Sequence, residues 1–439
     1  MASKRALNAR IRKLTKSRFV RNVATVVIGT AGAQVITLAF SPVVTRLYGP
    51  EALGMFGTFM AILAVTMPVA ALAYPVAIVL PKSDADAKSL AKLSICLAFV
   101  VALITGLLLL IAGDGIARML SLEAIGMLLL LIPVAMLFSV FHQILTQWLI
   151  RKKQFNITAR VAVIQALVIN SSKTGLGFLH PFGVTLIVLA TIGQAFHVFL
   201  LWAGMRGSDN TTILLGNNQS IVTTTEIAKR YRDFPLFRAP QNAINAFSES
   251  LPVLMLASLF GPSSAGFYSL GKMVMAAPLT LIAKSVGDVF YPRVTEAVND
   301  KENVFRLIVK ATLALAAIGF LPFALVIAFG PSIFSILFGL EWVMAGEYAR
   351  WLALWLFFGF LNRPSVAAMP ALGMQPWLLL YEVFSTGLKV AALALGFWYF
   401  DDDLTAIALM SVSGVVAYSA LILKVLIKAY SGDINEETS

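Results

Sequence analysis

Charged residues are scarce in this sequence. Asp, Glu, Lys and Arg make up 13% of its 439 residues, and hydrophobic residues make up 59%, whereas a soluble domain carries roughly 25% charged residues. This balance excludes an ordinary soluble domain. The net charge of +12 could suggest a nucleic-acid partner. The positive charge is instead distributed by membrane side, as described below, and we expect no binding to nucleic acid.

Residue patterns typical of metal sites and catalysis are also missing. The single cysteine, Cys96, excludes a disulfide framework and a cysteine metal site. The three histidines, His142, His180 and His197, lie far apart in the sequence and lack the spacing of metal ligands. The chain contains neither a glycine-rich phosphate-binding loop nor a nucleophile motif with a plausible base. The sequence therefore predicts no enzyme, no metal site and no bound cofactor.

Long apolar segments dominate the chain instead. Runs of about 20 apolar residues recur, which is the length that a helix needs to cross a bilayer core of roughly 30 Å. These runs are continuous rather than alternating, which favours helices over a β-barrel. We therefore predict an all-α polytopic membrane protein. Its twelve expected spans are residues 22–46, 53–80, 92–112, 126–149, 158–179, 183–204, 236–259, 265–290, 307–329, 348–370, 377–399 and 403–428.

Basic residues concentrate on alternate connections between these spans. Eight Lys and Arg residues precede the first span, and Arg151, Lys152 and Lys153 follow the fourth. The connections on the opposite side are poor in basic residues, and one of them contains the acidic run Asp401–Asp403. Because cytoplasmic loops carry the excess of Lys and Arg, we expect both termini on the cytoplasmic side.

A repeated motif divides the chain into two similar halves. The segment LFGPSSAGFY at 259–268 echoes LYGPEALGMF at 47–56, at an offset of 212 residues. Six spans separate the two copies, so the halves have the same orientation and an axis near the membrane normal should relate them. The expected domains are two six-helix lobes at 22–204 and 236–428, a cytoplasmic inter-lobe loop at 205–235, and cytoplasmic tails at 1–21 and 429–439.

The span that opens the second half carries a stripe of polar residues. In a helix, Arg238, Asn242, Asn245, Glu249 and Pro252 share one face, because their spacings are 4, 3, 4 and 3 residues. An ionisable residue inside a membrane span is a functional hypothesis by default. The stripe is therefore the leading candidate for a binding surface.

Distinctive motifs are distributed along nearly the whole chain. They are RFVRN at 18–22, Gly29-Thr30, TRLYGPEALGMFG at 45–57, AYPVAIVLP at 73–81, the segment 231–274, VFYPRV at 289–294, and LFGLEW with AGEYAR at 337–350. These motifs resemble those of the bacterial polysaccharide transporters, which include the O-antigen and exopolysaccharide-unit flippases. That group belongs to the multidrug/oligosaccharidyl-lipid/polysaccharide exporter superfamily. Some members have fourteen spans, whereas we expect twelve in this chain.

The resemblance implies two lobes around a central cavity that opens to one side of the membrane at a time. It also implies a flippase in the bacterial inner membrane, which moves undecaprenyl-diphosphate-linked oligosaccharide from the inner to the outer leaflet. The implied partners are membrane lipids, a polysaccharide polymerase and a chain-length regulator. Coupling to H⁺ or Na⁺ is the expected energy source.

Such a cargo requires cations for its diphosphate and amides or hydroxyls for its sugars. The candidate binding residues are Arg18, Arg46, Arg238, Gln241, Asn242, Asn245, Lys272, Arg350 and Arg363, and the candidate ion-coupling residue is Glu249. Each has a structural alternative. Arg238 could extend its charged head to the membrane interface, the amides could bond neighbouring helices, and Glu249 could pair with Lys272. Arg46 and Arg350 could instead pair with acids such as Glu51 and Glu347.

Other functions remain open at this point. A multidrug or toxin exporter and a peptidoglycan-precursor flippase share the implied fold, but an exporter should have a more apolar or acidic cavity. A membrane-embedded polysaccharide polymerase, ligase or glycosyltransferase belongs to a different class. Such enzymes usually work through a large outward loop, whereas the outward loops predicted here are short.

Overall fold

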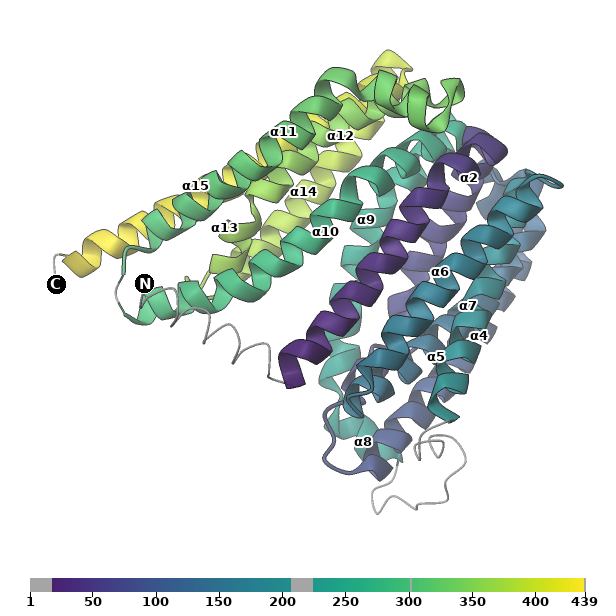
Figure 1. Ribbon diagram of the computed structural model, residues 1–439, viewed down its shortest axis with the longest axis horizontal. Coiled ribbons are helices and arrows are strands. Elements are labelled where there is room, and N and C mark those ends of the chain that lie inside the picture. The colour runs from purple at the N-terminus through teal and green to yellow at the C-terminus, as the bar shows by residue number, and fades with distance from the viewer. Residues whose placement is uncertain (1–17, 207–223, 301, 438–439) are drawn as a thin grey trace, which may run out of the picture. The chain divides into compact units, whose positions relative to one another are not determined.

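The computed structural model describes residues 18–206, 224–300 and 302–437, and every regular element in these ranges is a helix (Figure 1). Most of the basic N-terminal tail and residues 207–223 of the predicted inter-lobe loop lie outside the described residues. The chain is thus an all-α protein, as its apolar runs predict.

Each of the twelve predicted spans falls on a long helix, in some cases together with a short neighbouring helix. The elements are α2 (Arg18–Ala70), α3 (Tyr74–Ala77), α4 (Asp84–Met119), η1 (Glu123–Leu130), α5 (Leu131–Arg151), α6 (Phe155–Gly177), α7 (Gly183–Arg206), α8 (Thr224–Arg230), η3 (Phe234–Arg238), α9 (Ala239–Phe260), α10 (Pro262–Asn299), α11 (Val304–Phe338), η4 (Leu340–Trp342), α12 (Val343–Leu361), α13 (Arg363–Ala368), α14 (Gln375–Leu395), η5 (Gly396–Phe400) and α15 (Asp403–Glu437).

The first two predicted spans form one element, α2, that is interrupted at a glycine. Gly49 has φ 69° and ψ 174°, a conformation outside the helical region. Glycine adopts positive φ without a steric cost, and the following Pro50 suits the start of a new helix. Gly261 has φ 91° and also precedes a proline, at the start of α10. Both copies of the repeated motif therefore make the same turn.

The helices expose apolar surface as membrane spans do. Eight helices in the described part of the chain are long and apolar enough to cross a membrane. On α4, the side chains of Leu103 and Leu110 are 66% and 67% exposed, and that of Ile111 is 84% exposed. Monomeric soluble proteins rarely expose contiguous apolar patches of such extent. The protein is a multi-pass membrane protein.

The first compact unit comprises Met1–Tyr48 and Thr58–Ser250. In this unit α4 packs on α5, and α7 packs on both α5 and α6. Its buried apolar side chains include Leu90 of α4, Ile132 and Met136 of α5, and Leu201 of α7. Most of α9, as far as Ser250, also belongs to this unit.

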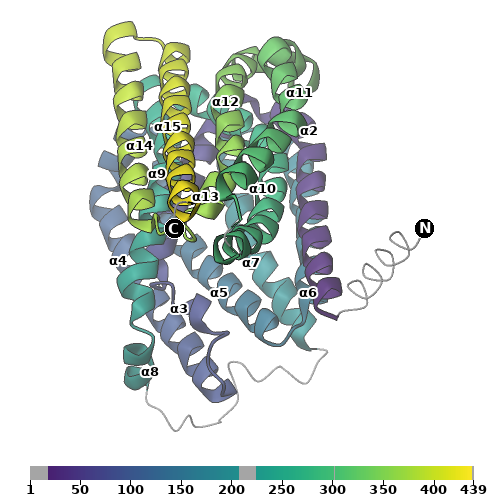
Figure 2. The same cartoon turned by 90° about the vertical axis from the view of Figure 1, so that its left-hand side faces the viewer.

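The second compact unit comprises Gly49–Gly57 and Leu251–Ser439. Here α11 packs on α12, and α15 packs on both α12 and α14 (Figure 1, Figure 2). Counting spans from the start of each half, the third packs on the fourth and the sixth packs on the fourth and fifth, as in the first unit. The two units thus repeat one packing pattern, as the sequence echo predicts.

The turn that leads into the fourth span of each half is also repeated. Ser121 has φ 51° and Gly339 has φ 111°, and each lies at the end of a long helix. A short 3₁₀ helix follows in both cases, namely η1 before α5 and η4 before α12. The weakly similar segments Leu120–Glu123 and Leu337–Glu341 therefore both contain a positive-φ residue between a long helix and a short 3₁₀ helix.

We call the repeated motif the Gly-Pro motif, after Gly49-Pro50 in the first copy and Gly261-Pro262 in the second. The two copies pack directly on each other within the second unit. A Cβ added to Gly54 would lie 1.7 Å from the carbonyl oxygen of Pro262, and one added to Gly266 would lie 2.1 Å from that of Pro50. The contact is reciprocal, because each motif places its second glycine on the proline of the other. Residues without a side chain are required at both positions, as in close helix crossings in membranes.

Candidate functional site

The predicted polar stripe lies on α9 and on the π-helical turn η3 that precedes it. The side chains of Arg238, Gln241, Asn245 and Glu249 are exposed, and that of Asn242 is half-buried. These five residues belong to the first unit, whose boundary follows Ser250, whereas Pro252, the last residue of the predicted stripe, belongs to the second. Gln241 lies beside the stripe. A π-helical turn inserts one extra residue into a helix and is frequent at functional sites. Here it ends at Arg238.

Asn242 lines a polar cavity of about 140 Å³ inside the first unit. The second side-chain amide in its wall is Gln143 of α5. The rest of the wall comes from the end of α2, the connection that follows it and α3, with the lining residues Met67, Pro68, Ala71, Ala73 and Val76. Two amides facing a cavity of this size can hold a hydroxyl-bearing group through several hydrogen bonds.

The chain changes direction at this cavity. Helix α2 ends at Ala70, and Leu72 and Ala73 have φ values of 48° and 59°. Positive φ is uncommon outside glycine and often marks a functional or tightly constrained segment. The hydroxyl of Tyr74 donates to the carbonyl oxygen of Ala228 at 3.2 Å, which holds α3 against α8. The AYPVAIVLP motif therefore forms one side of the cavity.

Basic residues at the end of α5 hold the rest of that motif. The Arg151 guanidinium donates to the carbonyl oxygens of Ile78 and Pro81, at 3.4 and 2.5 Å. It also forms an ion pair of 2.9 Å with Asp84, and Lys152 binds the other oxygen of that carboxylate. Arg151 and Lys152, which follow the fourth predicted span, thus hold the segment between α3 and α4 in place.

The remaining predicted site residues are distributed over both units. In the first unit, Arg46 is exposed on α2, and the side chain of Arg18 lies outside the described part of the structure. In the second unit, the Lys272 ammonium lies 5.9 Å from the ring centroid of Tyr268, and Arg363 is exposed at the start of α13. The pairing of Glu249 with Lys272 stays a prediction.

Arg350 has two partners within the second unit. Its Nη1 donates to Glu347 at 3.0 Å, which is the acid pairing that the sequence offered as one alternative. Its Nε donates to the carbonyl oxygen of Ile327 at 2.8 Å. In an uninterrupted helix this oxygen would accept from the residue four positions later, but that residue is Pro331 of α11 and has no N–H. Arg350 therefore replaces a missing helical hydrogen bond.

Sequence reasoning missed two features of the first unit. Gln143 could have been suspected, because His142-Gln143 is a polar pair in the middle of an apolar run. His142 and His197 lie 55 residues apart in the sequence, yet their ring centroids are 4.3 Å apart. Spacing along the chain could not reveal that contact. Among the described residues, no cluster of three or more His, Cys, Asp or Glu could hold a metal ion.

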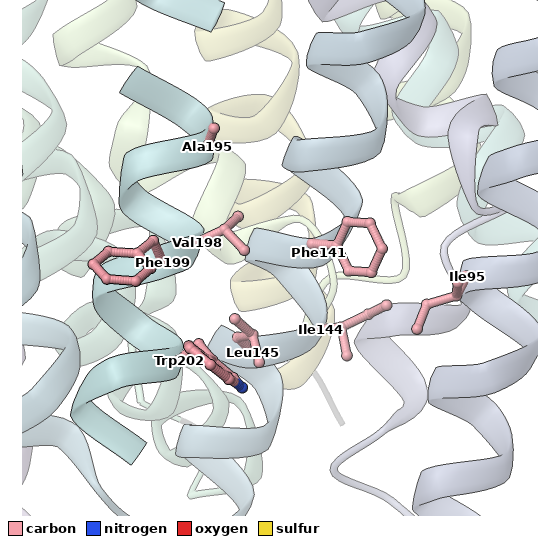
Figure 3. Close-up of a pocket in the computed structure, with 8 residues that line it drawn as sticks. All are labelled: Ile95, Phe141, Ile144, Leu145, Ala195, Val198, Phe199 and Trp202. Carbon is pink, nitrogen blue, oxygen red and sulfur yellow. The ribbon is translucent and has the colours of Figure 1, made fainter. Parts of the chain in front are cut away.

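A second cavity, of about 210 Å³, opens between α4, α5 and α7 of the first unit. Figure 3 shows its wall, where Phe141, Ile144 and Leu145 come from α5 and Ala195, Val198, Phe199 and Trp202 come from α7. Ile95 of α4 completes it. The wall is apolar, so this cavity lacks the hydrogen-bonding groups that a sugar requires.

Comparison with known proteins places the chain in a family. The family model described as polysaccharide biosynthesis protein matches residues 43–347. No curated protein matches the sequence significantly. The match includes the stripe on α9, the cavity with Asn242 and Gln143, and both copies of the Gly-Pro motif.

Solved structures of membrane transporters share the fold. The lipid II flippase MurJ in an inward closed conformation has a TM-score of 0.70 and 13% identity, covering 93% of this chain and 89% of that one. A multidrug resistance MATE family transporter in its inward-facing conformation has a TM-score of 0.66 and 15% identity, with 93% and 95% covered. A MOP superfamily transporter from Pyrococcus furiosus has a TM-score of 0.61 and 14% identity, with 94% and 96% covered.

The family model covers well over half of the chain, and the structural matches extend over nearly all of it. The protein therefore belongs to the polysaccharide biosynthesis protein family, and it has the two-lobed fold of the flippases and transporters of the MOP superfamily.

Proposed function

We propose that this protein is a flippase that moves undecaprenyl-diphosphate-linked oligosaccharide units from the cytoplasmic to the outer leaflet of a bacterial inner membrane. The observation that carries the proposal is the exposed polar set formed by Arg238 at the end of η3 and by Gln241, Asn245 and Glu249 on α9, in an otherwise apolar protein of this family. A lipid-exposed helix would carry apolar residues there, because polar groups in hydrocarbon are costly.

The stripe combines the groups that such a cargo requires. The diphosphate needs positive charge, and a guanidinium binds phosphate oxygens through two parallel hydrogen bonds. Arg238 is the proposed diphosphate contact. The sugars need neutral donors and acceptors, which Gln241, Asn242 and Asn245 supply, together with Gln143 in the adjoining cavity. In this proposal Lys272, Arg46, Arg18 and Arg363 are further diphosphate contacts during transfer.

Movement of cargo requires a carrier that opens to each side in turn. Energy must bias that cycle, because a ligand shifts an equilibrium only by its differential affinity for the two states. Glu249 is the proposed coupling group, which exchanges H⁺ or Na⁺ between the two sides of the membrane. The released units would be substrates for a polysaccharide polymerase and a chain-length regulator. The chemistry requires no cofactor.

The first prediction tests the diphosphate contact. Replacing Arg238 with Ala removes the cation and should abolish glycan export, whereas Arg238→Lys should keep part of it, because a point charge remains but the planar fork is lost. Glycan export in cells is the measurement, with membrane insertion monitored in parallel. Arg232→Ala is the matched control, since Arg232 is also exposed but precedes the stripe. Normal export by Arg238→Ala at normal expression would mean that Arg238 only reaches to the interface.

A multidrug exporter is the second candidate, because a MATE family transporter shares the fold with a TM-score of 0.66. Organic-cation drugs favour an acidic or apolar site, whereas three of the five stripe residues are neutral amides or arginine. Drug resistance assays of cells that overproduce the protein separate the two functions. The flippase proposal predicts unchanged resistance.

A further inference from the structure

Two of the chain's three histidines meet inside the helix bundle of the first unit. His142 of α5 and His197 of α7 have ring centroids 4.3 Å apart, with an angle of 59° between the ring planes. Each is half-buried. Each also lies nine residues before the basic residue that ends its helix, Arg151 or Arg206. At 1.5 Å per residue that is about 13 to 14 Å, close to the middle of a bilayer core of roughly 30 Å.

We propose that His142 and His197 form a proton-binding site in the first unit, which takes up one proton per pair and couples it to transport. Proton binding stands on the geometry of the pair, and the coupling step rests on the proposed transport function. Imidazole changes its charge near neutral pH more readily than any other side chain. An ionisable group at this depth is costly unless it has a partner or a function.

The pair can hold one proton but not two. A neutral imidazole has one N–H donor and one nitrogen acceptor, and a protonated imidazole has two donors. The ring centroids are too close, at 4.3 Å, for an aligned N–H···N bond, so a protonated ring donates to the acceptor nitrogen of its neighbour after the rings turn. A second proton would place two positive charges in contact, which the low local dielectric disfavours.

Other ionisable groups on the helices packed around the pair lie nearer the helix ends. On α4 these are Asp84, Asp86, Lys88 and Lys92 at one end and Asp114 and Arg118 at the other. Glu123 of η1, Arg160 and Lys173 of α6, and the phenol of Tyr74 of α3 are the remaining ones, besides Arg151 and Arg206. Cys96 of α4 is the one ionisable residue at intermediate depth, and it is exposed.

The apolar cavity between α5 and α7 gives the pair room to respond. Phe141, Leu145 and Val198 line that cavity, and they lie one to three residues from His142 or His197 (Figure 3). Close-packed helices resist displacement. The cavity of about 210 Å³ between the helices is lined by neighbours of the two histidines and not by the rings themselves. In this proposal it lets the two helices shift when protonation reorients the rings. A proton taken up from one side thereby changes the packing of the unit.

Titration of the histidine rings tests proton binding without any cargo. Because the chain has three histidines, selective ¹⁵N labelling gives three sets of ring signals, and His180→Gln removes the exposed one between α6 and α7. We expect the two remaining rings to titrate as a coupled pair, and His142→Gln to shift the midpoint of His197 by about one unit or more. Independent titration of the two rings, or no titration of either, overturns the proposal.

Transport in proteoliposomes tests coupling. His142→Gln and His197→Gln should lose the stimulation of cargo transfer by an imposed pH gradient, and His180→Gln should keep it. His142→Phe and His197→Phe retain a ring for packing and should show the same loss, which separates proton binding from folding. If these variants keep full stimulation, Glu249 alone carries the proton and the coupling role is wrong. If the wild type transfers no cargo while the rings still titrate as a pair, the flippase assignment fails and proton binding stands.

Discussion

Arg350 shows how a side chain can donate a hydrogen bond to a backbone carbonyl that has no donor within its own helix. It donates to the carbonyl oxygen of Ile327, which lost its helical donor because Pro331 has no N–H. The sequence predicted two alternatives for this arginine, a diphosphate contact or an acid pair. The ion pair with Glu347 was foreseeable from a spacing of three residues. The bond to Ile327 was not, since only the packing of α12 against α11 brings the two together.

This bond predicts a coupling between two substitutions. Arg350→Gln should lower the free energy of unfolding by about 1 kcal/mol, because the Ile327 oxygen loses its donor. In a Pro331→Ala background, the new N–H of residue 331 can bond Ile327, so Arg350→Gln should cost less there. Thermal unfolding of the four proteins in detergent measures the coupling. Pro322→Ala, in the same helix, is the control that should not couple, and purely additive effects of Arg350→Gln and Pro331→Ala would contradict this role.

The polar residues of the candidate site were easier to predict than their contacts with residues of other helices. The α9 stripe follows from helical periodicity alone, and three of its residues, Arg238, Asn245 and Glu249, are exposed. Its role as a binding surface stays a prediction. Gln143 and Asn242 line the same cavity only because α5 and α9 both lie next to the end of α2 at Ala70. Likewise, the contact between His142 and His197 arises from the packing of α5 on α7. Contacts between helices depend on tertiary packing, which hydropathy does not encode.

At the scale of helices, the positions of the spans were predictable and their lengths were not. The apolar runs predicted about 21 to 28 residues each, yet α4 has 36, α10 has 38 and α11 has 35. Hydropathy detects only the part of a helix inside the bilayer, and these helices extend into polar sequence at their ends. The N-terminus of α4 is an example, where Ser83 accepts a hydrogen bond from the N–H of Ala85 and caps the helix.

The crossing of the two Gly-Pro motifs predicts a strict requirement for glycine. Gly54→Ala should destabilise the second unit by about 3 kcal/mol or more, since the new methyl would overlap the carbonyl oxygen of Pro262. Gly113→Ala in α4 is the control, because a Cβ there meets no atom within 4 Å. It should leave stability unchanged or raise it slightly, since alanine favours a helix more than glycine does. Yield and melting temperature in detergent provide the comparison, and a well-folded Gly54→Ala protein would contradict the crossing.

At the scale of the whole molecule, the repeat and the charge distribution were readable from the sequence. The repeat appears in the matching order of helix contacts in the two units. The sidedness of the membrane is a prediction from the positions of Lys and Arg. The domain boundaries proposed from the sequence, at 204 and 236, also stay predictions.

Labelling of introduced cysteines tests this sidedness. In a Cys96→Ser background, which has no other cysteine, Asp402→Cys should react with an impermeant thiol reagent from outside the cell. Ser220→Cys, in the basic mid-chain connection beyond the described residues, should react only after permeabilisation. The untagged Cys96→Ser protein is the control for background labelling. The opposite pattern would reverse the orientation and place both termini outside.

Accumulation of lipid-linked glycan after deletion of the gene tests the central claim most directly. In the natural host, the deletion should remove the surface glycan and leave undecaprenyl-diphosphate-linked units on the cytoplasmic side of the inner membrane. The wild-type gene should restore export, and the Arg238→Ala gene should not. Normal surface glycan in the deletion strain, or accumulation of single units on the outer side, would contradict the assignment, because the second result is that of a missing polymerase or ligase.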